Sequence, residues 1–337
     1  MATVPKIIKF SGVGIHSGIK TTVKIKPSKK FGIFFIRTDI KGAHPVEASY
    51  KNVFDVTKWN TTIGKKPNEV QTIEHLMAAL FLCGIDSATI EIDGAEMPIL
   101  DGSANEFIDI ISRVKKPGVV SRKIIVKKEV IAYRREVIKK LPLLNRIYLF
   151  LHNLKTGRRE DGWVKLSPNK NGFLIKATLD YPDKIIGVQS SEYLYDGTKK
   201  SFDKFIKDIS KSRTFGRIWE WEYMKKKGMG RGATGENLIA INEDGTDTFN
   251  DIFNRGGAAR DTAIEKYGHL LPRDMKMTPL HSPDEFVRHK IIDAIGDIFT
   301  SGGFVYGTLE SHKGSHGLNN LVLRKLFSDP DNYEIVE

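Results

Sequence analysis

Cysteine is almost absent from this sequence, and so are the stretches that would place it in a membrane. Cys83 is the single cysteine in 337 residues, so no internal disulfide can form, and its apolar helical context predicts a small buried side chain rather than a nucleophile. The start, MATVPKIIKFSGVG, lacks the apolar segment of a secretion signal, and no long charge-free stretch follows. We therefore expect a cytoplasmic protein.

Signatures of nucleic-acid-binding folds are missing as well. The sequence has no RNP motif, no zinc-finger cysteine spacing and no long basic run. It does have 53 Lys and Arg against 41 Asp and Glu, a net charge of +12, which favours an anionic partner such as a phosphorylated substrate or a membrane surface. We expect no nucleic acid as partner, because the positive charge is the only feature that would favour nucleic-acid binding. Peripheral contact with the inner membrane stays open.

The pattern of strands and helices indicates an α+β fold. Short strands and helices alternate without a repeated strand-helix-strand unit, and the length suffices for two domains. Residues 6–26 predict a strand, a glycine turn and a strand, and residues 123–134 predict a pair of strands. The segment KKPGVVSR, residues 115–122, is typical of a linker. We therefore predict a domain boundary between residues 117 and 118.

Residues 285–297, EFVRHKIIDAIGD, place a histidine and two carboxylates on one stripe of a predicted helix. His289, Asp293 and Asp297 follow one another at intervals of four, so they lie on one face. A histidine and an aspartate one turn apart can both reach one zinc ion, at about 2.0–2.2 Å. The alternative is an ordinary buried hydrogen-bonded pair, which the stripe alone does not exclude.

Other candidate residues lie far from this stripe in the sequence. Thr72 is expected to cap a helix that ends at Gly84, and within it Glu74 and His75 can flank one point in space, as a metal-assisted hydrolase requires. An ordinary first helical turn is the alternative. His316 lies between glycines at the start of the last helix, and His16 lies on a glycine turn. Each could equally be a surface residue.

The glycine-rich stretch GMGRGATGENLIAINEDG, residues 228–245, could be mistaken for a phosphate-binding loop. No GK[ST] ends it, and no step from strand to helix frames it. We therefore expect it to serve packing or turns.

Taken together, six motifs resemble one enzyme family. GVGIHSG, TIEHLMAAL, PILDGSA, SRTFG, VRHKIIDAIGD and SHGLNN occur in this order, as in the UDP-3-O-acyl-N-acetylglucosamine deacetylases, the zinc amidases of lipid A biosynthesis. The resemblance implies two similarly built domains, residues 1–117 and 118–337, each a sheet layered with helices, with the active site between them. It implies Zn²⁺ as cofactor and a UDP-linked acylated amino sugar as substrate.

The resemblance also implies roles for single residues. The zinc ligands would be His75, His289 and Asp293. The reaction would use Glu74 as general base, His316 as general acid held by Asp297, and Thr214 at the reacting carbonyl. Lys290 would meet the phosphates of the substrate, and Phe215 its sugar or nucleotide.

The sequence departs from the family in its second half. Extra residues occur near 134–160 and 245–280, and the stretch at 230–243 differs where the family builds the insert that holds the acyl chain. The first insertion contains LPLLNRIYLFLHNL, which either packs on its own domain or lies on a membrane surface. Two alternatives remain for the function: a zinc amidohydrolase of another acylated amino sugar, and a basic nucleic-acid-binding protein with a structural metal.

Overall fold

The first half of the chain forms a five-stranded sheet covered on one face by two helices. The computed structural model describes residues 1–54, 59–116, 118–139, 143, 146–147 and 161–337. The sheet has the order β1-β2-β5-β3-β4, in which β3 and β5 are parallel and the other pairs antiparallel. Its elements are β1 (Ile8–Val13), β2 (Lys20–Pro27), β3 (Gly32–Arg37), β4 (Val46–Glu47), α1 (Glu74–Leu82), β5 (Ser87–Ile92) and α2 (Asn105–Ser112).

The second half forms a seven-stranded mixed sheet with its own helices. The strands run in the order β10-β9-β13-β6-β14, and β8 joins the sheet by pairing with β13 and β7. Alternation along β9, whose side chains are buried at every second position, fits a sheet with one covered face. The strands are β6 (Lys123–Val126), β7 (Val130–Tyr133), β8 (Trp163–Pro168), β9 (Phe173–Asp180), β10 (Val188–Tyr195), β13 (Phe304–His312) and β14 (Tyr333–Val336). The helices are α3 (Arg134–Ile138), α5 (Lys199–Asp208), α9 (Glu285–Phe299), α10 (His316–Leu326) and the 3₁₀ turn η1 (Pro330–Asn332).

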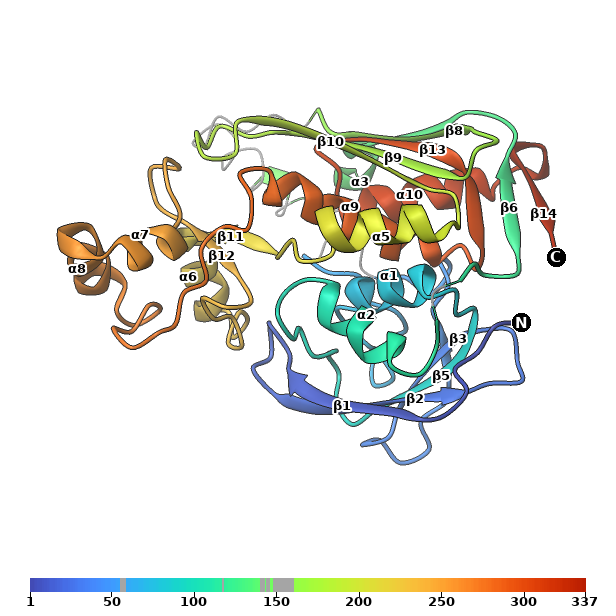
Figure 1. Cartoon of the computed structure of the whole chain (residues 1–337), viewed down its shortest axis with the longest axis horizontal. Coiled ribbons are helices and arrows are strands. Elements are labelled where there is room, and N and C mark those ends of the chain that lie inside the picture. Colours follow the sequence, from blue (N-terminus) through green and yellow to red (C-terminus); the bar gives the residue numbers. More distant parts are fainter. Residues whose placement is uncertain (55–58, 117, 140–142, 144–145, 148–160) are drawn as a thin grey trace.

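The two halves stack with their helices facing each other, so the molecule has a sheet on each outer side and helices between (Figure 1). All nine residues of α1 are buried, because this helix lies between its own sheet and α9. The predicted α+β architecture of two sheets layered with helices is confirmed.

One continuous apolar core runs through both halves. Phe81 of α1 stacks on Phe304 of β13 at a ring-centroid distance of 5.3 Å, and it also meets Phe299 at 5.4 Å. Among the described residues, every strand pair joins strands from the same side of residue 117. The predicted boundary stays a proposal, and the shared core makes the two halves one packing unit.

The strand prediction for residues 123–134 was right about the strands and wrong about their pairing. Both β6 and β7 form, but β6 pairs with β13 and β14, whereas β7 pairs with β8. A four-residue strand with an alternating pattern can pair with many different strands. The sequence therefore could not show which strands β6 and β7 pair with.

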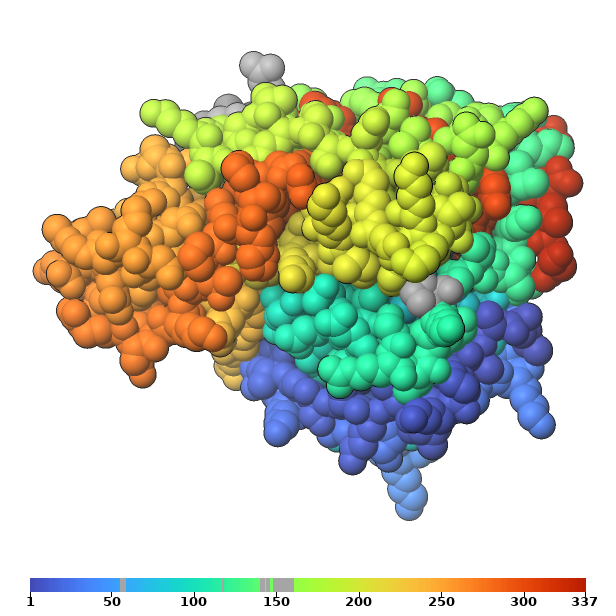
Figure 2. Space-filling model, viewed as in Figure 1, coloured from blue at the N-terminus to red at the C-terminus, as the bar shows by residue number. Residues whose placement is uncertain are grey.

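A small lobe projects from the second half, in gold and orange in Figure 2. A second apolar cluster, separate from the main core, fills it. The lobe contains β11 (Phe215–Arg217), α6 (Ile218–Lys226), β12 (Ile239–Ile241), α7 (Phe249–Arg255) and α8 (Gly257–Tyr267). The insertion predicted near 245–280 therefore contributes α7 and α8. The insertion near 134–160 lies for the most part outside the described residues, with its apolar stretch. None of the described helices is long and apolar enough to cross a membrane.

Candidate active site

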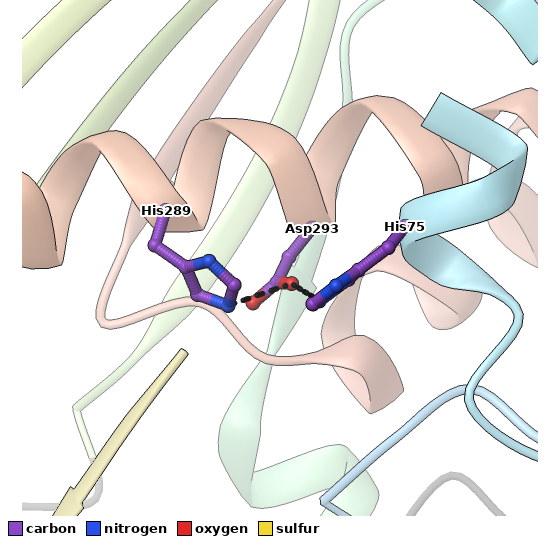
Figure 3. Close-up of side chains that lie close together, drawn as sticks. All are labelled: His75, His289 and Asp293. Atoms are coloured by element: carbon purple, nitrogen blue, oxygen red, sulfur yellow. Dashed lines mark ion pairs between the residues drawn. The ribbon is translucent and has the colours of Figure 1, made fainter. Parts of the chain in front are cut away.

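Two helices from different halves bring three candidate metal ligands together (Figure 3). One ligand atom each from His75 of α1 and from His289 and Asp293 of α9 lie within 4.8 Å of one another, and all three residues are buried. The Nε2 atoms of both imidazoles face the same carboxylate oxygen, Asp293 Oδ1, at 3.6 Å for His75 and 3.3 Å for His289. The helical stripe predicted from the sequence is thus joined by a ligand more than 200 positions away.

Close approach of α1 and α9 makes this convergence possible, and Gly296 allows it. A Cβ atom at Gly296 would lie 1.9 Å from the backbone oxygen of Glu74, so no larger residue fits without moving a helix. Gly296 lies between Asp293 and Asp297 on the stripe. The glycine therefore sets the distance between the helix that carries His75 and the helix that carries the other two ligands.

Local contacts prepare His289 and Asp293 to hold a cation. The Nδ1–H of His289 donates to the Ser212 carbonyl at 3.0 Å, which leaves the lone pair on Nε2. Burial lowers the pKa of His289 to about 4, so the ring is neutral at pH 7. Burial opposes ionisation of Asp293, but His289 and Lys290 lower its pKa well below the ordinary value. Two imidazoles and one carboxylate are a donor set that zinc takes while keeping a position open.

Glu74 lies beside this cluster and lines the same pocket. Its Oε2 accepts a hydrogen bond from the backbone N–H of Thr61 at 3.0 Å. Burial raises the pKa of Glu74 to about 7, against the opposing influence of His316 and His75. A carboxyl group with a pKa near neutrality can both accept and release a proton.

His316 occupies the first position of α10, on the other side of the pocket. Ser315 caps this helix, and the Nδ1 of His316 lies 2.9 Å from Asp297 Oδ2. Burial would lower the pKa of His316, but Asp297 outweighs it and raises that pKa to about 10. Asn319, one helical turn later, donates to the same Oδ2 at 2.9 Å. The imidazole is thus protonated at neutral pH and oriented by a carboxylate.

The remaining predicted site residues line the same pocket, and Lys290 also pairs with Asp293, three residues further along α9. Lys290 Nζ lies 2.8 Å from Asp293 Oδ2 and 5.5 Å from the centre of the Phe215 ring. Thr214 and Phe215 also line the pocket, just after the segment that holds His289. Every residue of the predicted catalytic set except Asp297, which lies behind His316, therefore faces one pocket.

Beyond the polar cluster the pocket becomes apolar. Its wall there consists of side chains from both halves of the chain: Ile15, Ile99, Trp221, Met224, Ala233 and Leu238. The two glycine-rich motifs meet at this wall, where the N–H groups of Arg231 and Gly232 donate to the carbonyls of His16 at 3.1 Å and Ile15 at 3.0 Å. A Cβ at Gly232 would lie 2.2 Å from the Gly14 oxygen. The glycines serve close backbone contact, as expected for the second motif.

The chain matches the family model described as UDP-3-O-acyl N-acetylglycosamine deacetylase over residues 1–255 and 251–328. A protein of Myxococcus xanthus named UDP-3-O-acyl-N-acetylglucosamine deacetylase is 34% identical over 335 residues, which is 99% of this chain and 88% of the relative. One of the same name from Shewanella violacea is 33% identical over 337 residues, covering 99% and 92%. The chain belongs to the UDP-3-O-acyl-N-acetylglucosamine deacetylase family.

Within this deacetylase fold, the prediction that Thr72 caps α1 is wrong. Ile73 occupies the cap position and makes no side-chain bond. Thr72 has a positive φ of 59°, and its hydroxyl accepts from Asn60 Nδ2 at 3.0 Å and donates to Glu96 Oε1 at 3.3 Å. Glu96 in turn accepts the N–H groups of His16 and Ser17 at 2.8 and 2.7 Å. Thr72 thus helps to anchor the loop that carries His16 into the pocket.

Sequence reasoning missed several residues of this deacetylase site. Thr61 contacts both Glu74 and Asp297, and Ser212 orients His289. Nothing in the sequence around Thr61 or Ser212 indicates these contacts, since they join segments far apart in the chain. Asn319 is different, because its spacing of three from His316 places it on the same helical face.

Proposed function

We propose that this protein hydrolyses the acetamide of UDP-3-O-acyl-N-acetylglucosamine, releasing acetate and the free amine, as a zinc enzyme of lipid A biosynthesis. The observation that carries the proposal is the His75, His289 and Asp293 cluster, which shares one buried pocket with Glu74 and His316 in a chain of this family. A zinc ion held by these three residues would supply a Lewis acid for the attack of water on the amide.

The protein's own groups handle the protons. Glu74 takes a proton from the attacking water while the water oxygen forms a bond to the carbonyl carbon. The pKa of Glu74, about 7, suits this proton transfer. The Thr214 hydroxyl donates to the carbonyl oxygen as negative charge develops there, an interaction typically worth about 3–4 kcal/mol. His316, protonated and held by Asp297, gives its proton to the leaving nitrogen as the C–N bond breaks. Acetate and a glucosamine amine result.

We assign the rest of the substrate to the other parts of the pocket. The apolar wall formed by both halves suits the 3-O-acyl chain, because it is the apolar part of the same pocket. Lys290 and Phe215 line the same pocket, and a cation beside an aromatic ring suits the phosphate and sugar. The net charge of +12 supports an anionic nucleotide substrate and peripheral contact with the inner membrane from the cytoplasm.

Metal analysis of the purified protein, with activity measured before and after chelation, tests the proposal. We expect about one zinc ion per chain and turnover that falls on chelation and returns with zinc. Full activity of metal-free protein would refute the zinc mechanism. Comparing the acylated substrate with its unacylated form tests the specificity, since equal rates would mean that the enzyme does not recognise the 3-O-acyl chain.

A further inference from the structure

The short segment around Thr61 lies between α1, which carries Glu74, and α9, which carries Asp297. Asn60, Thr61 and Thr62 are all buried, with exposed fractions of 3%, 3% and 0%. Three consecutive buried polar residues need internal partners, because an unpaired buried hydroxyl or amide costs about 1–3 kcal/mol. The partners of Thr61 are the carboxylates of Glu74 and Asp297.

Thr61 donates to Glu74, the proposed general base, and to Asp297, which holds the proposed general acid His316. Its backbone N–H donates to Glu74 Oε2 at 3.0 Å, and its hydroxyl donates to Asp297 Oδ1. The other oxygen of Asp297 accepts from His316 and Asn319. Within the described part of the chain, Thr61 is the one donor to Oδ1. The orientation of the Asp297 carboxylate therefore depends on this hydroxyl.

We propose that Thr61 is a positioning residue that sets the proton acceptor and the proton donor of the reaction relative to each other. Its N–H fixes one oxygen of Glu74, and its hydroxyl fixes Asp297, which fixes the His316 ring. This inference rests on the proposed function for the roles of Glu74 and His316. The backbone N–H of Thr61 reaches α1, and its hydroxyl reaches α9 and, through Asp297, α10, so a shift of Thr61 would displace both groups together.

A matched pair of variants tests the inference. Thr61→Val keeps the shape and the N–H but removes the hydroxyl, whereas Thr61→Ser keeps the hydroxyl. We expect Thr61→Val to lower kcat by about 10- to 100-fold, as loss of a partner behind a site residue typically does, with KM and zinc affinity unchanged. Thr61→Ser should keep most of the wild-type kcat. The control is Thr62→Val, because Thr62 is equally buried but its hydroxyl donates to Asn60.

A second readout does not depend on turnover. The ¹⁵N NMR signals of the His316 ring report its hydrogen bond to Asp297, and we expect them to change in Thr61→Val but to stay as in the wild type in Thr62→Val. Unchanged His316 signals with wild-type kcat in Thr61→Val would overturn the inference, as would equal losses in the two valine variants. If the wild type lacked deacetylase activity while the signals still changed, the proposed function would fail and the positioning contact would stand.

Discussion

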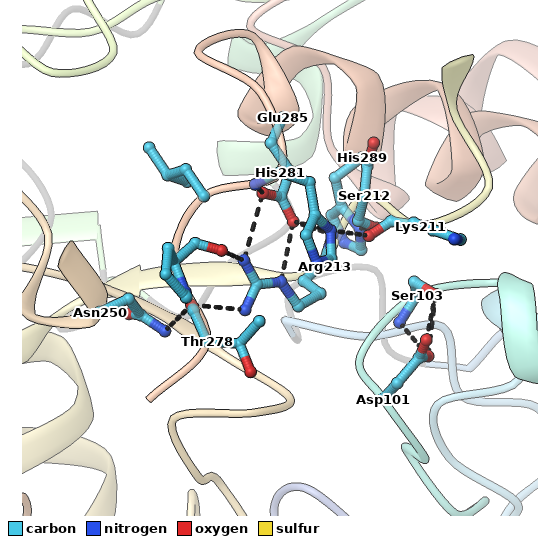
Figure 4. A network of polar contacts seen from close by, with 12 residues as sticks. Asp101, Ser103, Lys211, Ser212, Arg213, Asn250, Thr278, His281, Glu285 and His289 are labelled. Carbon is cyan, nitrogen blue, oxygen red and sulfur yellow. Dashed lines mark hydrogen bonds and ion pairs between the residues drawn. The ribbon is translucent and has the colours of Figure 1, made fainter. Parts of the chain in front are cut away.

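Arg213 and Glu285 form a buried ion pair at the N-terminus of α9 (Figure 4). Arg213 directly follows Ser212, whose carbonyl accepts the hydrogen bond of His289. Arg213 Nε lies 2.9 Å from Glu285 Oε1, and its other nitrogens donate to the carbonyls of Thr278 and Pro279. Burial would raise the pKa of Glu285, but His281 and Arg213 outweigh it and lower the pKa to about 2. The Arg213 guanidinium thus connects three parts of the chain: its own segment after Ser212, the first residue of α9, and the segment at Thr278 and Pro279.

This ion pair makes a pH-dependent contribution to stability. Because the folded pKa of Glu285 is about 2, below its ordinary value of 4.5, the stabilisation is complete above pH 4.5 and is lost as the pH falls towards 2. We expect Glu285→Gln to lower the free energy of unfolding by about 3–5 kcal/mol at pH 7, since Arg213 is left buried without a counter-charge. Urea unfolding of both proteins at several pH values measures the difference.

The difference should shrink between pH 4.5 and 2 as the wild-type carboxylate takes up its proton. A difference that is the same at pH 7 and pH 3 would show that Glu285 contributes through packing rather than through its charge.

Glu74 gives a second prediction for a single side chain. Glu74→Gln keeps the size of the side chain and removes the proton acceptor, so kcat should fall by at least about 100-fold while zinc remains bound. Steady-state kinetics and metal analysis of the same preparation measure both. Glu106→Gln, which changes a carboxyl group of α2 away from the metal ligands, serves as control. A variant with wild-type kcat would remove Glu74 from the base role.

How far single residues could be predicted depended on whether their partners lie on one helix. The stripe of His289, Asp293 and Asp297 follows from helical periodicity, and the structure places all three as the stripe requires. Thr61 and Ser212 act through contacts between distant segments, which a sequence does not encode locally. The sequence around Thr72 is typical of a helix cap, but its hydroxyl forms hydrogen bonds with Asn60 and Glu96 instead.

At the scale of secondary structure, the contact between α1 and α9 leaves no room for a larger residue at position 296. Gly296→Ala would place a methyl group 1.9 Å from the Glu74 oxygen, and backbone at that distance cannot give way without moving a helix. We expect a loss of about 1–3 kcal/mol in the free energy of unfolding together with weaker zinc binding, because the helices that carry the ligands must separate. Thermal or urea unfolding and zinc competition titrations measure the two effects.

Gly118→Ala is the matched control, since a Cβ there meets only the end of the Lys115 side chain at 3.8 Å. If Gly296→Ala bound zinc as tightly as the control, the spacing of α1 and α9 would not determine metal affinity.

Helices and strands with a clear hydrophobic periodicity were predictable from the sequence, whereas the strands that pair with one another were not. The strand, glycine turn and strand predicted near the start of the chain and the helix predicted over residues 285–297 have the right element types, as β1, β2 and α9 show. The short strands β6 and β7 formed as expected, but each pairs with a strand distant in sequence. Pairing is decided by how the helices pack on the sheet, and that information is spread over the whole chain.

At the scale of the whole molecule, the candidate metal site joins the two halves. His75 comes from the first sheet-and-helix layer, and His289 and Asp293 come from the second. A ligand that binds only the folded state stabilises it by about 4 kcal/mol at a free concentration a thousand times its Kd. We therefore expect chelation to lower the melting temperature of the whole protein in one cooperative step, because the halves share a core.

Calorimetry with and without chelator measures this shift. Asp293→Ala, which lacks one ligand, should melt at the same temperature in both conditions. A chelator effect of equal size in that variant would mean that the stabilising metal binds elsewhere.

The division of the ligands between the two halves also has a consequence for synthesis. His75 leaves the ribosome roughly 200 residues before His289, and at about 5–20 residues per second this interval lasts roughly 10–40 s. During that time α1, which is buried on all sides in the finished protein, has no α9 to cover it. Under the proposed zinc chemistry, metal insertion is a late event, and nascent chains stalled before residue 285 should bind no zinc tightly. Until α9 has been made, the apolar surface of α1 stays uncovered, which makes the nascent chain prone to aggregation.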